Sequence, residues 1–487
     1  MQMKYFKWFM RFFLAGVVVV GIVLFINYKN KPLCDKCNVI LVSLDTLSAL
    51  HLPCYGYEKN TAINLCEYAY RNTFFINSYS QAPITLDSHF SIFTSLYPHT
   101  HKMTNIYGPS LNEKYLTLAQ VFRNSGYKTI YNGPLTDAHL PLNRGIERGF
   151  NVTEGMGASS WNGSLARLMK NTQKNEPTFL FLHTYAVHNP YLTGHKEKHI
   201  FTNLPEYPNI PLTLDEYQKL SPEFLSFSAN KIEQSNFYYN ASATRNSDIE
   251  IAKKLLKEDI TIEDKTILFN KLPEQVRYFC FSIWSLNNVD LKDPNQIDFM
   301  KALYDEQIYN LDKQLSQLFS LMDDPKLSKN TILIITADHG EEFMEHRELF
   351  HGQNLYQTST RVPLIIHIPG VESQKIQEMV EGIDIYPTAL SLTGLKPKSH
   401  IEGIDLTGMI RGDKDAPKNS YLLSEFNGEV SIQAQNWRYY YNIRKKNPTG
   451  LYNLLADPTE QKNLLSERTI IGNNFKNLVN TLSLTAQ

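Results

Sequence analysis

The sequence has little of several features that mark specialised classes of protein. Five cysteines in 487 residues are too few for a disulfide scaffold. The formal net charge is −1, so the composition gives no support to nucleic acid as a partner. We find no internal repeat and no low-complexity tract, and 42% hydrophobic residues exclude a disordered chain. The length fits one large globular domain with a smaller companion.

Long apolar runs are also scarce, with one exception near the N-terminus. Phe12 to Ile26 is uninterruptedly apolar and follows Lys4, Lys7 and Arg11. This run is close to the ~20 residues that cross a bilayer, and no small residues of a signal-peptide cleavage site follow it. We therefore predict that residues 1–30 form a cytoplasmic tail and a single transmembrane signal anchor. The remaining chain would then face the periplasm from a bacterial inner membrane. A buried helix is the alternative.

Four of the five cysteines follow this run closely. Outside the cytoplasm, the pairs Cys34–Cys37 and Cys54–Cys66 are plausible disulfides. A zinc site built from the same four residues is the alternative, although their spacing suits it poorly. Cys280 is expected to pack as a small apolar residue.

Short apolar runs alternate with helical patterns, which predicts an α/β fold. Such runs are typical of strands buried on both faces of a parallel sheet. A helix is predicted over Thr117–Ser125, and apolar side chains from Tyr304 to Met322 fall on one helical face. We therefore expect a sheet with helices on both sides. The predicted strands are Val39–Leu44, Phe179–Leu182, Ile332–Ile335 and Leu364–Ile366.

The alternation of strands and helices is interrupted once and fades before the C-terminus. Residues 196–297 are polar, with helical stretches such as Ile249 to Lys257, and their length predicts a functional insertion. We therefore predict a main domain at 38–395 that carries this insertion, and a smaller C-terminal subdomain at 396–487.

Side chains that can bind a metal follow three predicted strands. Asp45 ends the first, His183 and His188 follow the second, and Asp338 and His339 follow the third. Ligands bind outside the carboxyl ends of strands in open α/β sheets, so we expect these groups to converge. Carboxylates with an imidazole suit a divalent cation. Each residue alone also has an ordinary structural explanation, since an aspartate after a strand often caps a helix.

The stretch Ala82–His89, followed by Ser91–His99, resembles the nucleophile segment of the sulfatase branch of the alkaline phosphatase superfamily. Other matching segments come in the family's order. The resemblance spans about Asn38 to Leu464 apart from the insertion. It implies a central mixed, mostly parallel sheet with helices on both faces. The other segments are Leu44–Leu47, Tyr55–Tyr57, His188–Tyr191, Thr336–Glu341, His351–Gly352, Arg361–Leu364, Asp384–Thr388, Leu451–Leu454 and Asp457–Glu460.

The resemblance implies an enzyme that cleaves phosphate, phosphonate or sulfate esters, or transfers the group to another acceptor. By position, it makes Asp45, Asp338 and His339 metal ligands. Thr85 would be a nucleophile bound to the same ion, and His188 would protonate the leaving oxygen.

The resemblance also implies substrate contacts and a cofactor. His351, Asn105 and His89 stand where relatives place substrate-binding groups. The ligand set suits zinc or manganese better than calcium or magnesium, which remain possible. The expected substrate is a small-molecule, glycan or lipid ester.

Of the positions that depart from the family pattern, which include Ser48 and Cys66, Thr85 and Asp87 bear most directly on the chemistry. Sulfatases carry cysteine or serine at the position of Thr85 and convert it to formylglycine, which threonine cannot form. We therefore expect phosphoryl or phosphonyl transfer to exceed sulfate-ester cleavage. Asp87 replaces a proline, and an acid beside an anion site opposes binding unless it faces away. The alternatives are a catalytically degenerate binding protein and a sulfuric ester hydrolase that works without formylglycine.

Overall fold

The computed structural model describes residues 31–104, 108–133, 140–155, 161–189, 191, 200–201, 221–234, 242–272, 276–277, 280, 284 and 289–482. The predicted anchor at Phe12–Ile26 lies outside these residues and stays a prediction. Within the described ranges, no helix has both the length and the apolar character needed to cross a bilayer.

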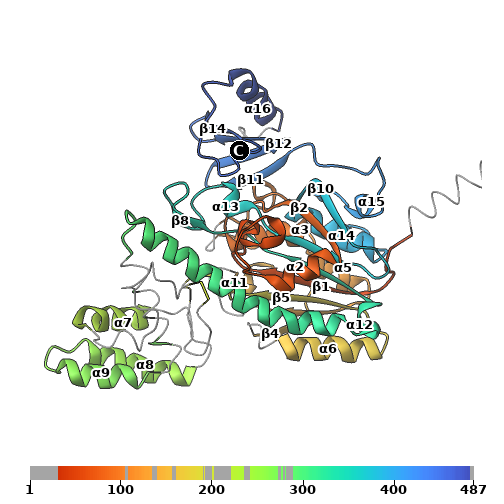
Figure 1. Ribbon diagram of the computed structural model, residues 1–487. Coiled ribbons are helices and arrows are strands. Elements are labelled where there is room, and N and C mark those ends of the chain that lie inside the picture. The colour runs from red at the N-terminus through yellow and green to blue at the C-terminus, as the bar shows by residue number, and fades with distance from the viewer. Residues whose placement is uncertain are drawn as a thin grey trace, which may run out of the picture.

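An eight-stranded sheet forms the centre of the molecule (Figure 1). Neighbouring strands are parallel, except that β9 runs antiparallel to both β2 and β6. The predicted mixed, mostly parallel α/β fold is therefore confirmed. In spatial order the strands are β10 (Gln374–Glu381), β2 (Thr73–Tyr79), β9 (Leu364–His367), β6 (Thr331–Thr336), β1 (Asn38–Leu44), β5 (Thr178–Thr184), β3 (Lys128–Asn132) and β4 (Val152–Glu154).

Helices cover both faces of this sheet, as its unbroken apolar strands predict. Along β1, Val39 and Leu41 join one buried cluster, whereas Ile40 and Val42 join the other. The first cluster includes α3 (Thr85–Thr94), α5 (Leu118–Asn124) and α14 (Ile385–Leu392). The second includes α2 (Ile63–Tyr70), α6 (Trp161–Gln173) and the long α11 (Pro294–Met322).

Helix α5 shows how local sequence sets the ends of these elements. Thr117 caps it, since its side chain accepts from the Gln120 amide while the Gln120 side chain accepts from the Thr117 amide. Gly126, at φ +90°, follows its end and turns the chain toward β3. The predicted helix is confirmed.

A smaller antiparallel sheet forms the C-terminal part of the chain. It consists of β11 (Leu422–Phe426), β12 (Glu429–Ala434), β13 (Trp437–Asn442) and β14 (Asn447–Asn453), in that order, and α16 (Thr469–Thr481) packs on it. Main-chain bonds dock it onto the larger domain, since the Glu425 amide donates to the Gln81 carbonyl at 2.8 Å.

Three helices lie to one side of the central sheet (Figure 1). They are α7 (Pro222–Gln234), α8 (Ser242–Leu255) and α9 (Ile262–Asn270), and they share a small core of their own. They fall within the predicted insertion, whose boundaries stay a prediction.

The remaining short elements are η1 (Ala49–His51), η2 (Pro53–Tyr55), α4 (Pro98–His101), η3 (Leu142–Arg144), α12 (Pro325–Ser328), β7 (Glu342–Phe343), β8 (Leu349–Phe350), α13 (Gln357–Thr360), η5 (Gly382–Asp384) and α15 (Thr407–Ile410).

The four clustered cysteines form two disulfides. Cys34 pairs with Cys37 and Cys54 with Cys66, with Cα–Cα distances of 5.5 and 5.3 Å. The zinc alternative is therefore wrong. Cys280 is a free thiol buried in the core of the three helices, which confirms its expected packing.

Candidate active site

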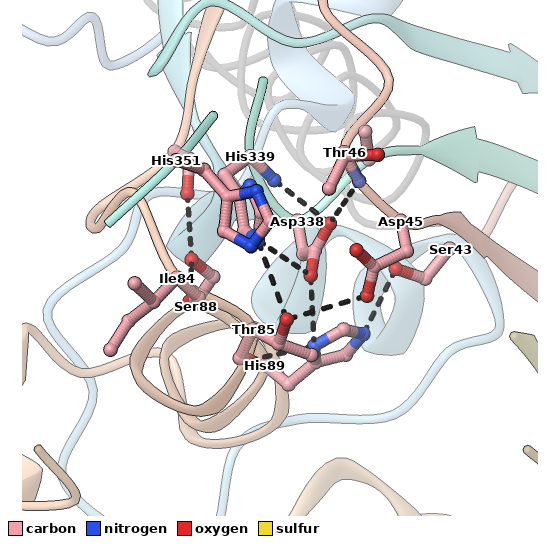
Figure 2. Close-up of polar contacts among 12 residues, drawn as sticks. Ser43, Asp45, Thr46, Ile84, Thr85, Ser88, His89, Asp338, His339 and His351 are labelled. Carbon is pink, nitrogen blue, oxygen red and sulfur yellow. Dashed lines mark hydrogen bonds and ion pairs between the residues drawn. The ribbon is translucent and has the colours of Figure 1, made fainter. Parts of the chain in front are cut away.

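Side chains from three elements converge at the carboxyl edge of the central sheet. Asp45 follows β1, Asp338 and His339 follow the adjacent parallel strand β6, and Thr85 begins α3. Ligand atoms of Asp45, Asp338 and His339 all lie within 4.8 Å of one another, and all three residues are buried. Thr85 Oγ1 lies 3.4 Å from Asp45 Oδ2 and 3.3 Å from His339 Nε2 (Figure 2). The expected convergence of these four residues is therefore what the structure shows.

Main-chain groups hold Asp338 in place. Its Oδ1 accepts from the amides of Thr46 at 3.1 Å and His339 at 2.9 Å. Thr46 has φ +59°, which is strained for a β-branched residue. The Tyr304 hydroxyl fixes this turn, because it donates to the Thr46 carbonyl at 2.6 Å and accepts from the Ser48 amide at 2.9 Å.

The donor atoms fit a divalent cation. His339 Nδ1 donates to the Gly340 carbonyl at 2.9 Å, which leaves the lone pair of Nε2 facing Thr85 and Asp338. Asp338 Oδ2 is buried and accepts no hydrogen bond from the described residues. A buried carboxylate oxygen without a donor is costly, and a bound cation removes that cost.

Burial and neighbouring charges set the protonation states that metal ligands require. Burial lowers the pKa of the His339 imidazole. Burial alone would raise the pKa of the Asp338 carboxyl, but the imidazoles of His339, His89 and His183 bring it below its ordinary value. An ionised carboxylate and a deprotonated imidazole nitrogen are the forms that bind a metal.

His89 lies beneath Thr85 and has no exposed surface. Its Nδ1 donates to the Thr85 carbonyl at 2.8 Å, and its Nε2 accepts from the Ser43 hydroxyl at 2.9 Å. The substrate contact expected for His89 therefore has no open nitrogen to make it, because both already have partners. The structure instead suits His89 to hold the first turn of α3 beneath Thr85.

Asp87 faces away from the candidate metal site formed by Asp45, Asp338 and His339. Residues two apart on a helix point to nearly opposite sides, and the charge that acts on Asp87 most is Glu425 of the C-terminal sheet. Burial raises the pKa of the Asp87 carboxyl well above its ordinary value. A carboxyl on the far side of α3 does not face an anion bound at Thr85.

Two half-buried histidines, His188 and His351, stand beside the buried groups. The His351 ring lies 4.5 Å from the His339 ring and 4.8 Å from the His188 ring. His351 Nδ1 contacts Glu341 Oε1 at 2.9 Å, and the Tyr191 hydroxyl donates to Glu341 Oε2 at 2.9 Å. Burial raises the pKa of Glu341 to about 7. Sequence reasoning gave Glu341 and Tyr191 no role, although both fall within matched segments.

Asn105, expected to contact substrate, lies outside the described residues. The other site residues form one continuous group, from buried carboxylates through a hydroxyl to histidines with exposed edges. Metal-dependent ester hydrolases are built from such groups: clustered carboxylates and an imidazole, a hydroxyl at a helix N-terminus, and a second imidazole near the surface.

The chain belongs to the sulfatase family. The family described as Sulfatase matches residues 37–395. A second, described as N-sulphoglucosamine sulphohydrolase, C-terminal, matches residues 344–484. The predicted class, a sulfatase-like ester hydrolase, is therefore confirmed, while the threonine nucleophile is a separate question.

Named relatives and solved structures extend this likeness over most of the chain. Delta 4,5-hexuronate-2-O-sulfatase of Bacteroides thetaiotaomicron is 23% identical, over 89% of this chain and 85% of that protein. Arylsulfatase K of Gallus gallus is 25% identical, over 93% and 83%.

Two solved structures show the same fold. A protein in complex with its substrate D-glucosamine-2-N,6-O-disulfate has a TM-score of 0.67 at 19% identity, covering 92% of this chain and 98% of that one. A phosphonate monoester hydrolase of Agrobacterium radiobacter has a TM-score of 0.62 at 17% identity, covering 93% and 96%.

Proposed function

We propose that this chain is a metal-dependent hydrolase of sulfate esters in which Thr85 Oγ1 is the nucleophile. The observation that carries the proposal is the position of that oxygen. Thr85 is the first residue of α3. Its Oγ1 lies 3.4 Å from Asp45 Oδ2 and 3.3 Å from His339 Nε2, beside the candidate cation ligands. The first N–H groups of α3 can also bind an anionic ester group.

A divalent cation held by Asp45, Asp338 and His339 would supply positive charge that activates the hydroxyl and neutralises the ester. We propose zinc or manganese for this site, with calcium and magnesium as the alternatives to test. Side chains of the protein carry out the nucleophilic attack and the proton transfers. Thr85 Oγ1 forms a bond to sulfur and passes its proton to the Asp45 Oδ2 that it faces, while the bond from sulfur to the alcohol oxygen breaks.

His188 is proposed as the acid that protonates the departing alcohol. Water then attacks the sulfur of the Thr85 sulfate ester, which restores the hydroxyl and releases sulfate. His351, held by Glu341, is proposed to contact the bound ester group. His89 is proposed to position Thr85 through its carbonyl.

We propose a sulfated acidic saccharide as the substrate class. Support comes from relatives, one named a hexuronate 2-O-sulfatase and one solved with a glucosamine disulfate as its substrate. We also propose an extracytoplasmic location, because two disulfides suit an oxidising compartment. Activity of a reporter that functions only in the cytoplasm, when it is fused to the C-terminus, would exclude that location.

Hydrolysis of phosphate or phosphonate esters is a second candidate, favoured by Thr85 itself. A threonine has one hydroxyl, so its covalent ester has to be attacked at the central atom. A phosphoryl group carries more charge on its oxygens for a cation and a helix N-terminus to stabilise.

A panel of esters assayed with the purified protein distinguishes these functions. It contains sulfated saccharides, aryl sulfates, phosphate mono- and diesters and phosphonates, each with and without a chelator. Faster turnover of sulfates supports the first candidate, and faster turnover of phosphorus esters supports the second. Stoichiometric metal with no turnover of any ester would favour the catalytically degenerate binding protein and exclude both.

A further inference from the structure

His183 is a buried imidazole beside the site, which the sequence groups with the possible metal-binding side chains but to which the family resemblance gives no role. It lies in β5, where it is paired with Ser43 of β1, so its side chain comes to the same sheet edge as Asp45. Its exposed fraction is 0%. Its Nε2 lies 3.3 Å from Asp45 Oδ2.

Neither ring nitrogen of His183 makes a hydrogen bond with the described residues. A buried imidazole in this condition loses its hydration without replacement, which costs free energy. Its ring neighbours do not remove that cost, because Phe181 stacks on it and Tyr185 meets it edge-on. A main-chain contact with Ser43 raises the pKa of the His183 imidazole, but this effect ranks below those of burial and of the charges of His89, Asp338 and His188. His89, by contrast, is equally buried but uses both nitrogens.

Two atoms around Asp45 Oδ2 have the spacing of ligands that share one ion, although His183 is not among the three residues whose candidate ligand atoms all lie within 4.8 Å of one another. Ligand atoms bound to a metal at about 2.0–2.2 Å lie roughly 3.0–3.5 Å from one another. Thr85 Oγ1 lies at 3.4 Å and His183 Nε2 at 3.3 Å from this oxygen. The pair His339 Nε2 and Asp338 Oδ2 lies at 3.5 Å.

We propose that His183 Nε2 is a further ligand of the metal site, an inference that rests on the proposed metal-dependent function. The donor set then holds two imidazoles, two carboxylates and a hydroxyl. Imidazole suits zinc, whereas calcium and magnesium take oxygen donors. His183 therefore makes the site select zinc over calcium.

Metal affinities of the full chain test this assignment. We compare His183→Gln with wild-type protein after metal removal, by competition with chelators for zinc and separately for calcium. Zinc affinity should fall on the order of 10- to 100-fold, the range seen when groups that tune a metal site are lost. Calcium affinity should change far less.

The matched control is His101→Gln. His101 is also buried, but its Nδ1 accepts from the Met103 amide and its Nε2 contacts the Ser91 hydroxyl, both outside the site. Its zinc affinity should equal that of wild-type protein. If His183→Gln binds zinc as tightly as this control, His183 is not a ligand.

A second measurement needs no variant and covers the case in which His183→Gln fails to fold. X-ray absorption of zinc-loaded wild-type protein counts imidazole ligands, and we expect two. A single imidazole overturns the proposal. Neither readout uses turnover, so a protein with two imidazoles on zinc that cleaves no ester would refute the proposed function alone.

Discussion

The site divides into two regions that are built differently. We call Asp45, Thr85, Asp338 and His339 the floor, and His188 and His351 the rim. The floor residues are at most 3% exposed, and their oxygens and nitrogens are fixed by strand ends and main-chain contacts. Both rim residues are half-buried. His351 is held by its contact with the Glu341 side chain, and His188 lies in the loop that follows β5. A rigid floor suits a small ion of fixed geometry, and a less constrained rim suits a variable substrate.

Among the variants of the floor, Asp338→Asn should cause the broadest loss of function. The amide keeps the shape but removes the negative charge, so metal affinity and turnover should both fall by on the order of a hundredfold or more. Metal content and ester turnover measure this directly, and a chelator should reproduce the loss in wild-type protein. Asp312→Asn is the control, since that buried carboxylate accepts from the Asn64 and Leu65 amides away from the site. Full metal affinity in Asp338→Asn would contradict the assignment.

Thr85→Ala tests whether Thr85 contributes to turnover as the nucleophile rather than through metal binding. Removal of the attacking oxygen should lower kcat on the order of a thousandfold. The three remaining ligands should keep bound metal measurable, and Thr85→Ser should retain part of the turnover. Wild-type turnover in Thr85→Ala would exclude a threonine nucleophile and leave water as the attacking group.

His188→Gln tests the rim. Loss of a general acid should lower kcat about 100-fold for alkyl esters, whose leaving oxygen needs a proton. The loss should be much smaller for nitrophenyl esters, whose leaving group departs unprotonated. Metal affinity should not change. An equal loss for both kinds of ester would show that His188 does not act as the acid.

Glu341→Gln tests whether the rim is held in place by its contact with the buried carboxylate. Weakening the bond to His351 should raise KM about tenfold, which corresponds to about 1.4 kcal/mol and to one hydrogen bond with a charged group. Steady-state kinetics should show kcat nearly unchanged. A fall in metal affinity instead would place Glu341 with the floor.

The smallest effect is expected outside both regions, at Glu381. Its Oε1 accepts from the Leu423 amide and its Oε2 from the Tyr97 hydroxyl, so it joins the two sheets. Burial raises its pKa and that of Asp384. The folded state therefore holds protons that the unfolded state releases from about pH 4 upward, and stability should fall as pH rises.

Glu381→Gln should flatten this dependence without changing metal affinity. Urea unfolding at several pH values between about 4 and 8 measures the slope. An unchanged slope in the variant would show that the pH dependence arises elsewhere.

Sequence reasoning found the strands that are buried on both faces, because burial demands unbroken apolar runs. Val39–Leu44 became β1 almost residue for residue. The strand β10 was missed, since Gln374–Glu381 mixes exposed and buried positions at the sheet edge. The strand β2 was missed because Asn77 and Ser78 interrupt its apolar run. The direction of β9 was not predictable either, because an apolar run carries no information about which way the strand runs.

The same contrast holds within the site. Asp45, Asp338 and His339 could be expected to converge because each follows a strand of one parallel sheet. The roles of His89 and Asp87 could not be predicted, because they depend on how α3 is rotated about its axis, and tertiary packing sets that rotation. The two residues lie on nearly opposite sides of that helix.

The two amides that bind Asp338 Oδ1 limit this residue to one-point coordination. Both lone-pair directions of that oxygen are used by Thr46 and His339, so an ion can take only Oδ2. A calcium ion normally takes roughly six to eight oxygens, often with a two-point carboxylate among them. Around a calcium ion, positions would thus be left for oxygens of the ester, whereas the five protein donors would fill a zinc site. Ion and ester then share one binding equilibrium, and each should tighten the other by the same factor.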